Sequence, residues 1–125
     1  MESTHRSNSK QAVQQRREQR RRALDTELRR IVGLLAERDD IVAVIVFGSV
    51  ARNECGERSD LDLVVVQHTD RAFTDRVEEV YQLVLPRVDV DVLVYTPEEF
   101  EELKRDRPFG RRLAAEGRVV YEAAA

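Results

Sequence analysis

A continuous apolar run, Ile41–Phe47 (IVAVIVF), ends abruptly at Gly48. Its short length and its β-branched residues predict a strand that is covered on both faces. Leu61–Val66 and Val88–Tyr95 have the same character and predict a second and a third strand. A chain with such strands must pack helices on its sheet, so the predicted class is α/β with a small mixed sheet.

Residue patterns typical of helices occur before, between and after these strands. Leu24, Leu28, Ile31 and Leu35 recur at helical spacing and predict a long helix over residues 10–37 with one apolar stripe. Thr69 or Asp70 could cap a second helix that runs to about Leu85. Its expected buried side comprises Phe73, Val77, Val80, Tyr81 and Val84. A capping box of Thr96 and Glu99 predicts the start of a helix from Pro97 to about Arg105. A short helix over Arg111–Glu116 and an edge strand over Arg118–Tyr121 complete the predicted elements.

These patterns divide the chain into three parts. Residues 1–9 are polar and without periodicity, which predicts a disordered tail. Residues 10–37 form the long helix, and residues 38–125 form one small α/β domain. A chain of 125 residues is long enough for one modest core.

Charge is distributed unevenly along the chain. Residues 1–37 hold nine Lys or Arg against five Asp or Glu, whereas residues 38–125 hold twelve against nineteen. An acidic body therefore carries a basic N-terminal arm. The arm could contact an acidic partner, but it lacks the aromatic residues or fold signature that would favour nucleic acid.

The sequence has no feature that points to a membrane or to secretion. No apolar run approaches the roughly 20 residues that a membrane-spanning helix needs. The first ten residues are polar and basic, and Cys55 is the single cysteine. We therefore expect a cytoplasmic protein without an intramolecular disulfide.

Two pairs of aspartates occupy the predicted second and third strands. Asp60 and Asp62 alternate with leucine, and Asp89 and Asp91 alternate with valine, so each pair lies on one face of its strand. If the strands are neighbours, three or four carboxylates converge and repel one another. A hard cation such as Mg²⁺ would resolve that repulsion, although aspartates at strand ends can also simply face solvent.

Gly48-Ser49 follows the first strand directly. Glycine permits a sharp turn and a close approach of phosphate to the backbone, and Ser49 lies at the start of a predicted helical turn. A glycine and a serine after a strand usually form only a turn. The position of this pair about ten residues before Asp60 makes the combination more specific.

Gly48-Ser49-Val50-Ala51-Arg52, followed by Ser59-Asp60-Leu61-Asp62-Leu63, resembles the signature of the DNA polymerase β-like nucleotidyltransferases. The match is closest to the minimal nucleotidyltransferases (MNT), which include antitoxin partners of HEPN-domain toxins. Asp91–Glu99 is similar to the strand that carries the third carboxylate and to the helix after it. The resemblance extends from about Ile41 to Tyr121 and implies the nucleotidyltransferase fold.

The resemblance also implies roles for individual residues. Asp60, Asp62 and Asp91 would ligate two Mg²⁺ ions, and Asp91 would help to deprotonate an acceptor hydroxyl, with Asp89 as the second candidate. Gly48 and Ser49 would bind the phosphates of ATP. Arg52 would either contact phosphate or brace the turn. Asn53 departs from the family pattern, in which a glycine often follows the arginine.

The implied activity is the transfer of a nucleoside monophosphate, with AMP from ATP favoured, to a hydroxyl acceptor. Because the chain is short, the acceptor is expected on a partner protein such as a HEPN toxin, or on a second copy of the chain. One alternative is a non-catalytic nucleotide-binding antitoxin that acts by contact. Another is a small-molecule (antibiotic) nucleotidyltransferase, which would need a larger acceptor pocket.

Overall fold

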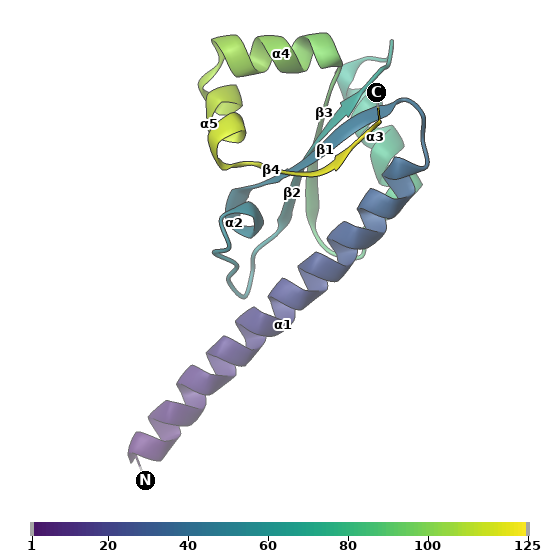
Figure 1. Ribbon diagram of the computed structural model, residues 1–125. Helices are drawn as coiled ribbons and strands as arrows, with labels where there is room; N and C mark the ends of the chain where they lie inside the picture. Colours follow the sequence, from purple (N-terminus) through teal and green to yellow (C-terminus); the bar gives the residue numbers. More distant parts are fainter. Residues whose placement is uncertain (1, 125) are drawn as a thin grey trace.

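The computed structural model describes residues 2–124, and the side chains of residues 9–124 (Figure 1). Helices and strands alternate along most of the chain. In order they are α1 (Glu2–Ala36), β1 (Ile41–Phe47), α2 (Gly48–Ala51), β2 (Leu61–Gln67), α3 (Phe73–Val84), β3 (Val90–Tyr95), α4 (Pro97–Asp106), α5 (Pro108–Glu116) and β4 (Arg118–Glu122).

The four strands form one mixed sheet in the order β3-β2-β1-β4. β1 pairs with β2 and with β4 in antiparallel fashion, whereas β2 and β3 are parallel and are connected through α3. The long helix α1 precedes this small mixed sheet and the helices that pack on it. The predicted fold class is therefore confirmed, including the mixed sheet.

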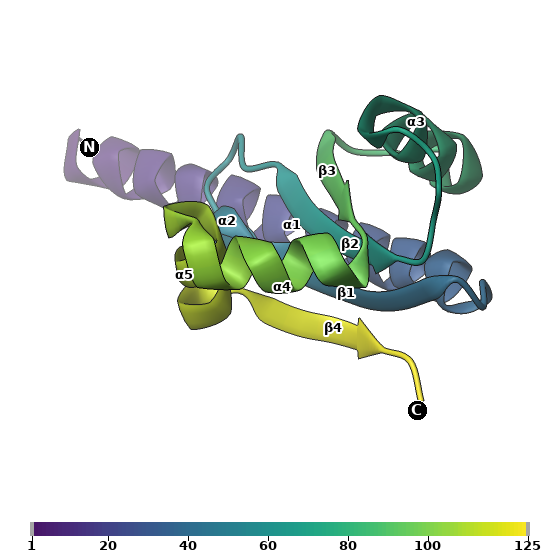
Figure 2. The ribbon, with the colours of Figure 1, turned by 90° about the horizontal axis from the view of Figure 1, so that it is seen from above.

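Helices cover both faces of the sheet (Figure 2). On one face, α1 and α3 pack on the core side chains of β1, β2 and β3, among them Val44, Leu63 and Val92. On the other face, α4 and α5 cover a smaller cluster that includes Ile45 and Val64. The alternation along β1 thus buries both of its faces, as its continuous apolar sequence predicts.

α1 has two different halves. Its second half packs on the sheet through the predicted stripe, since Leu24, Leu28, Ile31 and Leu35 are all buried. Its first half extends beyond the domain (Figure 1). The helix begins at Glu2, before the expected start at Lys10. The predicted tail at residues 1–9 lies almost wholly outside the described side chains, and the division of the chain into three parts stays a prediction.

A buried ionic contact fixes the second half of α1 to the body. Glu27 is only 4% exposed, and it accepts hydrogen bonds from Arg30 (Nε···Oε1, 2.6 Å) and from the backbone N–H of Arg87. Arg30 in turn donates to the carbonyl of Leu85 (3.1 Å), the left-handed residue that ends α3. Glu27 and Arg30 therefore join α1 to the connection between α3 and β3.

The observed helix starts match the prediction at α4 and differ from it at α3. The predicted capping box is present, because Thr96 Oγ1 accepts from the N–H of Glu99 and the Glu99 carboxylate accepts from the N–H of Thr96. The prediction that Thr69 or Asp70 caps the next helix is wrong. Thr69 Oγ1 instead accepts a hydrogen bond from the N–H of Arg71 (3.1 Å), and α3 starts later, after Ala72.

Two smaller expectations also need correction. α5 begins at Pro108 and not at Arg111, because proline fits the first helical position, where its missing N–H costs nothing. Phe73 was expected on the buried side of α3, but it is 40% exposed and its ring packs on that of Tyr95 at 5.8 Å. None of the described helices is long and apolar enough to cross a membrane.

Candidate active site

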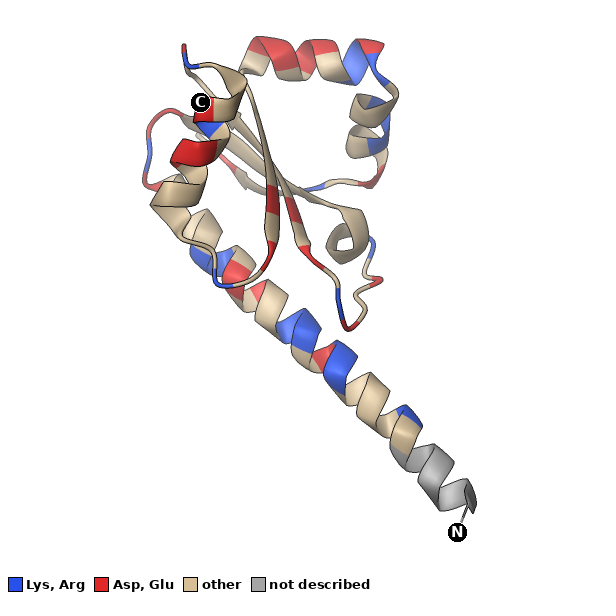
Figure 3. Ribbon diagram, turned by 180° about the vertical axis from the view of Figure 1, so that it is seen from behind, with Lys and Arg blue, Asp and Glu red and all other residues tan. Residues whose placement is uncertain are grey.

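Asp62 and Asp91 stand side by side on β2 and β3. They are register partners in the parallel pair, so the neighbouring strands bring their Cα atoms level with each other. Leu61 and Leu63 flank Asp62 and pack into the core on the opposite face. The expected convergence of acids on neighbouring strands is thus present for these two residues, and acidic segments lie together on the two strands in Figure 3.

The environment of Asp62 disfavours its ionised form. Burial raises the pKa of the Asp62 carboxyl above its usual value, and the negative charges of Asp91 and Asp60 raise it further. The guanidinium of Arg52 acts in the opposite direction but more weakly. A cation placed between Asp62 and Asp91 would reverse this effect by neutralising both carboxylates.

Gly48 lies directly against Asp62. It has a φ of 73°, a left-handed conformation that favours glycine. A Cβ atom built on residue 48 would lie 2.3 Å from Oδ2 of Asp62. Gly48 is therefore required both by its backbone conformation and by the space that the carboxylate occupies. The turn after β1 and the position of the Asp62 carboxylate on β2 therefore depend on each other.

The turn that follows Gly48 explains the departure at Asn53. α2 is a single turn, and its end is closed by hydrogen bonds from Arg52 N–H to the Gly48 carbonyl and from Glu54 N–H to the Ser49 carbonyl. Asn53 has a φ of 58°. Asparagine adopts this left-handed conformation more readily than other side chains, so it can replace the glycine found in similar chains.

Asp60 precedes β2 and is oriented toward α1. The Arg20 side chain donates to the carbonyl of Ser59 (Nε···O, 2.8 Å) and places Nη2 at 3.9 Å from Asp60 Oδ1. One turn earlier on α1, Arg16 forms an ion pair with Glu57 (2.7 Å) in the same loop. Sequence reasoning missed Arg20 as a site residue, although it stands four residues before Leu24 on the face that packs on the body.

Asp89 and Arg52 contribute less to the arrangement of the candidate site than Asp62 and Asp91 do. The backbone carbonyl of Asp89 accepts a hydrogen bond from the N–H of Leu61 (3.1 Å), which fixes the start of the β2–β3 pairing. Asp89 lies just before β3, whereas Asp91 lies within it. The Arg52 side chain donates to Glu54 (3.1 Å) and so braces the turn.

A cavity of about 260 Å³ opens beside Gly48, between α2 and α5. Phe47, Phe109 and Leu113 form its apolar walls, and the Phe47 and Phe109 rings meet edge to face at 5.4 Å. The remaining lining residues are Gly48, Arg52, Arg112 and Glu116. The cavity thus joins the acidic site at Gly48 and offers two guanidinium groups to a ligand.

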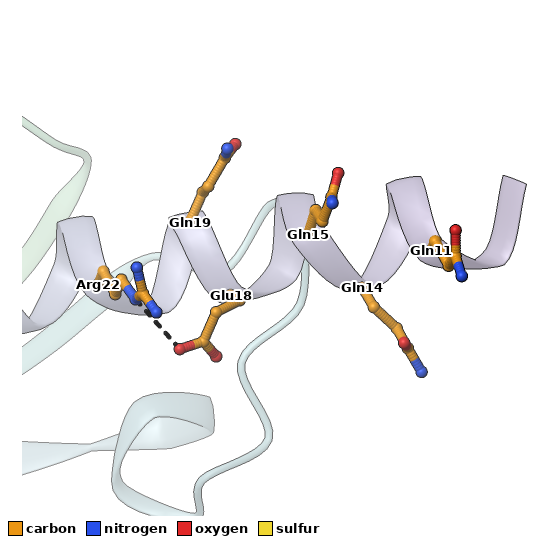
Figure 4. Close-up of a pocket in the computed structure, with 6 residues that line it drawn as sticks. All are labelled: Gln11, Gln14, Gln15, Glu18, Gln19 and Arg22. Atoms are coloured by element: carbon orange, nitrogen blue, oxygen red, sulfur yellow. Dashed lines mark hydrogen bonds and ion pairs between the residues drawn. The ribbon is translucent and has the colours of Figure 1, made fainter. Parts of the chain in front are cut away.

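A larger hollow of about 760 Å³ lies along the first half of α1 and is lined by residues of that helix alone (Figure 4). Gln15 and Gln19 point to one side of the helix, whereas Gln14 and Glu18 point to the other. A hollow beside one helix, without walls from a second element, is an open surface. We therefore place the candidate site at Gly48, Asp62 and Asp91.

The residues at the site fit a divalent cation in part. Among the described side chains, no group of three or more His, Cys, Asp or Glu is arranged to hold a metal ion. Mg²⁺ in proteins, however, commonly uses one or two carboxylates together with water and substrate phosphates. Asp62 and Asp91 supply two such carboxylates, and Asp60 would have to turn away from Arg20 to supply a third.

A mixed sheet with a Gly-Ser turn after β1 and paired acids on β2 and β3 defines a nucleotidyltransferase-type domain. Residues 29–124 match the family model of "Polymerase beta, Nucleotidyltransferase". The chain therefore belongs to the polymerase β nucleotidyltransferase family. A search of curated proteins gave no significant match.

Solved structures with similar folds include a putative nucleotidyltransferase from Sulfolobus solfataricus. It is 21% identical, with 80% of this chain and 86% of that chain covered and a TM-score of 0.55. A toxin–antitoxin structure with AMP-PNP is 16% identical, with 76% and 73% covered and a TM-score of 0.47. A mutant toxin–antitoxin structure, MntA–HpeT, is 18% identical, with 74% and 70% covered and a TM-score of 0.48.

Proposed function

We propose that this protein transfers a nucleoside monophosphate, with AMP from ATP favoured, to a hydroxyl group on a partner protein. The observation that carries this proposal is that Asp62 and Asp91 are register partners on the parallel strands β2 and β3, and that Gly48 lies next to the Asp62 side chain. Within a nucleotidyltransferase family member, this geometry offers two acids and an adjacent backbone turn to a nucleoside triphosphate and its cation.

Asp62 and Asp91 would hold Mg²⁺, with Asp60 as the third ligand after it leaves Arg20. The ions would neutralise charge on the phosphates and on the leaving pyrophosphate. Asp91 is 29 positions from Asp62 in sequence but level with it in the sheet, and it is the more exposed of the two. It is therefore the better placed to accept a proton from an incoming hydroxyl.

In the proposed reaction, the acceptor oxygen forms a bond to the α-phosphorus of ATP. The bond from that phosphorus to the bridging oxygen breaks, and pyrophosphate leaves with the electron pair. The hydroxyl proton passes to Asp91. Catalysis in this scheme consists mainly of positioning and charge neutralisation, which a small domain can supply.

The cavity between α2 and α5 is proposed to hold the part of the nucleotide that extends past Gly48. Its volume of about 260 Å³ is just below the usual range for small-molecule pockets, so it suits only part of a nucleotide. Arg52 and Arg112 give it positive charge for phosphate oxygens, and Phe47 and Phe109 give it aromatic surface.

The acceptor is proposed to come from another chain. Asp91 faces solvent, and β3 is an edge strand of the sheet, so a macromolecular substrate can reach the site. A HEPN-type toxin is the favoured partner, which would make this protein an antitoxin; a second copy of the chain is the other candidate. We propose that the complex acts in the cytoplasm.

The proposal is tested by incubating the protein with Mg²⁺, ATP labelled at the α-phosphate, and the product of the neighbouring gene. Transfer of label to that protein, abolished by Asp62→Asn and retained by the exposed Asp75→Asn, is the expected result. Equal labelling by the wild type and by Asp62→Asn would refute the enzymatic role. ATP analogues with other bases would establish the base preference.

A second candidate function is a non-catalytic antitoxin that neutralises its partner by contact. The observations in its favour are that Asp60 lies beside Arg20 and that the described side chains do not assemble a three-ligand metal group. The combined substitution of Asp60 and Asp62 by asparagine separates the two functions. A contact-only antitoxin would still neutralise its partner, whereas an adenylyltransferase would not.

A further inference from the structure

Arg20 stands at the point where α1 leaves the body of the protein. It precedes Leu24 by one turn, and Leu24 is the first fully buried residue of the apolar stripe. The Arg20 side chain is about three-quarters buried, and it makes two contacts with the loop before β2. It donates to the Ser59 carbonyl at 2.8 Å and lies 3.9 Å from the Asp60 carboxylate.

These contacts connect α1 to the acids of the candidate site. Asp60 lies two positions before Asp62, directly ahead of the strand that carries Asp62, and Arg20 is the cation that the described structure places beside it. Arg16 strengthens the connection one turn away through its ion pair with Glu57. The loop Glu57–Asp60 is therefore held to α1 by two arginines, whose partners lie 41 and 39 positions later in the sequence.

A guanidinium beside Asp60 opposes the uptake of a divalent cation, because its positive charge lies next to the carboxylate that the cation would otherwise use. The Ser59 hydrogen bond adds a constraint, because it fixes the backbone next to Asp60 in this orientation. Neither contact belongs to the hydrophobic packing of α1.

We propose that Arg20 is a positioning residue that competes with the divalent cation for Asp60. In this arrangement, the orientation of α1 determines whether Asp60 joins Asp62 and Asp91. The proposal depends on the cation site that the proposed function assigns to these acids. It concerns cation binding by the free protein, in the absence of nucleotide and acceptor. It can therefore fail or hold independently of whether adenylyl transfer is observed.

The test is a titration of the full-length protein with Mn²⁺, a paramagnetic substitute for Mg²⁺, followed by electron paramagnetic resonance at physiological ionic strength. Arg20→Gln is expected to bind Mn²⁺ roughly two- to fivefold more tightly than the wild type, the size expected for loss of a partly exposed ion pair. Arg20→Lys keeps the charge and is expected to stay close to the wild type.

Arg21→Gln is the matched control, because it removes the same charge one position away. Arg21 pairs with Glu18 of the same helix (2.5 Å) and not with Asp60, so its loss should leave Mn²⁺ affinity unchanged. A second control is Asp60→Asn, in which the additional Arg20→Gln substitution should no longer raise the affinity. Thermal unfolding of each variant checks that the fold is retained.

Three results would overturn the proposal. They are equal Mn²⁺ affinity for the wild type and Arg20→Gln, a similar gain for Arg21→Gln, and a gain that persists in the Asp60→Asn background. Absence of Mn²⁺ binding to both the wild type and Arg20→Gln would also overturn it, because competition requires a cation site at Asp60.

Discussion

A Cβ atom on residue 48 would lie 2.3 Å from Oδ2 of Asp62, so Gly48 and Asp62 occupy adjoining space that admits no larger side chain. The left-handed φ of Gly48 adds a backbone reason for glycine at this position. The glycine after β1 thus fixes the turn and also leaves room for the acid on β2. Its two roles can be tested together.

Gly48→Ala is expected to lower the free energy of unfolding by about 1–3 kcal/mol through backbone strain. It should also displace Asp62 and lower the transfer rate by roughly a hundredfold. Urea unfolding and transfer of labelled AMP measure the two effects. Gly56→Ala is the control, because its Cβ would make only an ordinary contact with Ser59 Oγ (3.8 Å); a similar loss there would contradict the argument.

Asp62→Asn is expected to stabilise the metal-free protein at neutral pH. The pKa of Asp62 is raised by burial and by Asp91, so the folded state holds its proton more tightly than the unfolded state. The stability of the wild type is therefore reduced as pH rises above the usual aspartate pKa of 3.8, whereas the amide does not titrate.

Denaturation between pH 4 and 7 in the presence of a chelator measures this difference. The gain in unfolding free energy from Asp62→Asn should grow as pH rises and should disappear as pH falls toward 4. Asp39→Asn, in the exposed turn before β1, should show no such trend. A gain that is independent of pH would mean that the electrostatic explanation is wrong.

The choice between Asp91 and Asp89 can be decided by single substitutions. Asp91→Asn should lower transfer roughly a hundredfold or more, in line with the loss of a catalytic base. Asp89→Asn should have an effect of a few-fold at most, because the contact of Asp89 with β2 is made by its backbone carbonyl. The reverse order of effects would make Asp89 the third carboxylate.

Arg112→Ala is expected to weaken ATP binding about tenfold, consistent with the loss of a hydrogen bond to a charged group. Isothermal titration with a non-hydrolysable ATP analogue measures this. The neighbouring Arg111 is exposed on the same helix and does not line the cavity, so Arg111→Ala is a close control. Equal effects of the two substitutions would indicate a general charge effect and would exclude a role for the cavity.

Glu27→Gln is expected to lower the free energy of unfolding by about 1–3 kcal/mol at neutral pH, because buried partners lose their acceptor. The Arg30 guanidinium, together with the Arg87 N–H, holds the pKa of Glu27 below 4.5. Its stabilising contribution is thus present above pH 4.5 and is lost as pH falls through the pKa of the folded state.

Chemical denaturation at pH 7 and at pH 3 compares Glu27→Gln with the wild type, and the difference should shrink at the lower pH. The exposed Glu18→Gln on the same helix provides the comparison and should change stability little. A cost for Glu27→Gln that is equally large at both pH values would show that packing, not charge, anchors α1.

The sequence was sufficient to predict the elements whose signals are local. The β-branched run before Gly48, the alternation of aspartates with leucine and valine, and the capping box at Thr96 each depend on residues a few positions apart. The structure places the corresponding strands as predicted, with β2 beside β3. The roles of Asp60, Asp62 and Asp91 stay predictions.

The two features that the sequence did not reveal have different causes. Arg20 contacts Ser59, 39 positions away, because of the position in which α1 packs on the sheet, and no local pattern records that position. The start of α3 was missed because Thr69 accepts a hydrogen bond from the N–H of Arg71 and so closes a local turn instead of capping the helix.

The parallel pairing of β2 and β3 also bears on how this domain can change its acceptor. The spacing between Asp62 and Asp91 is set by a backbone ladder of about 4.8 Å per strand, not by the surrounding loops. Loops and the α4–α5 segment could therefore be exchanged by evolution, or by design, while the two acids keep their separation. Such a scaffold would allow new specificity without rebuilding the proposed catalytic centre.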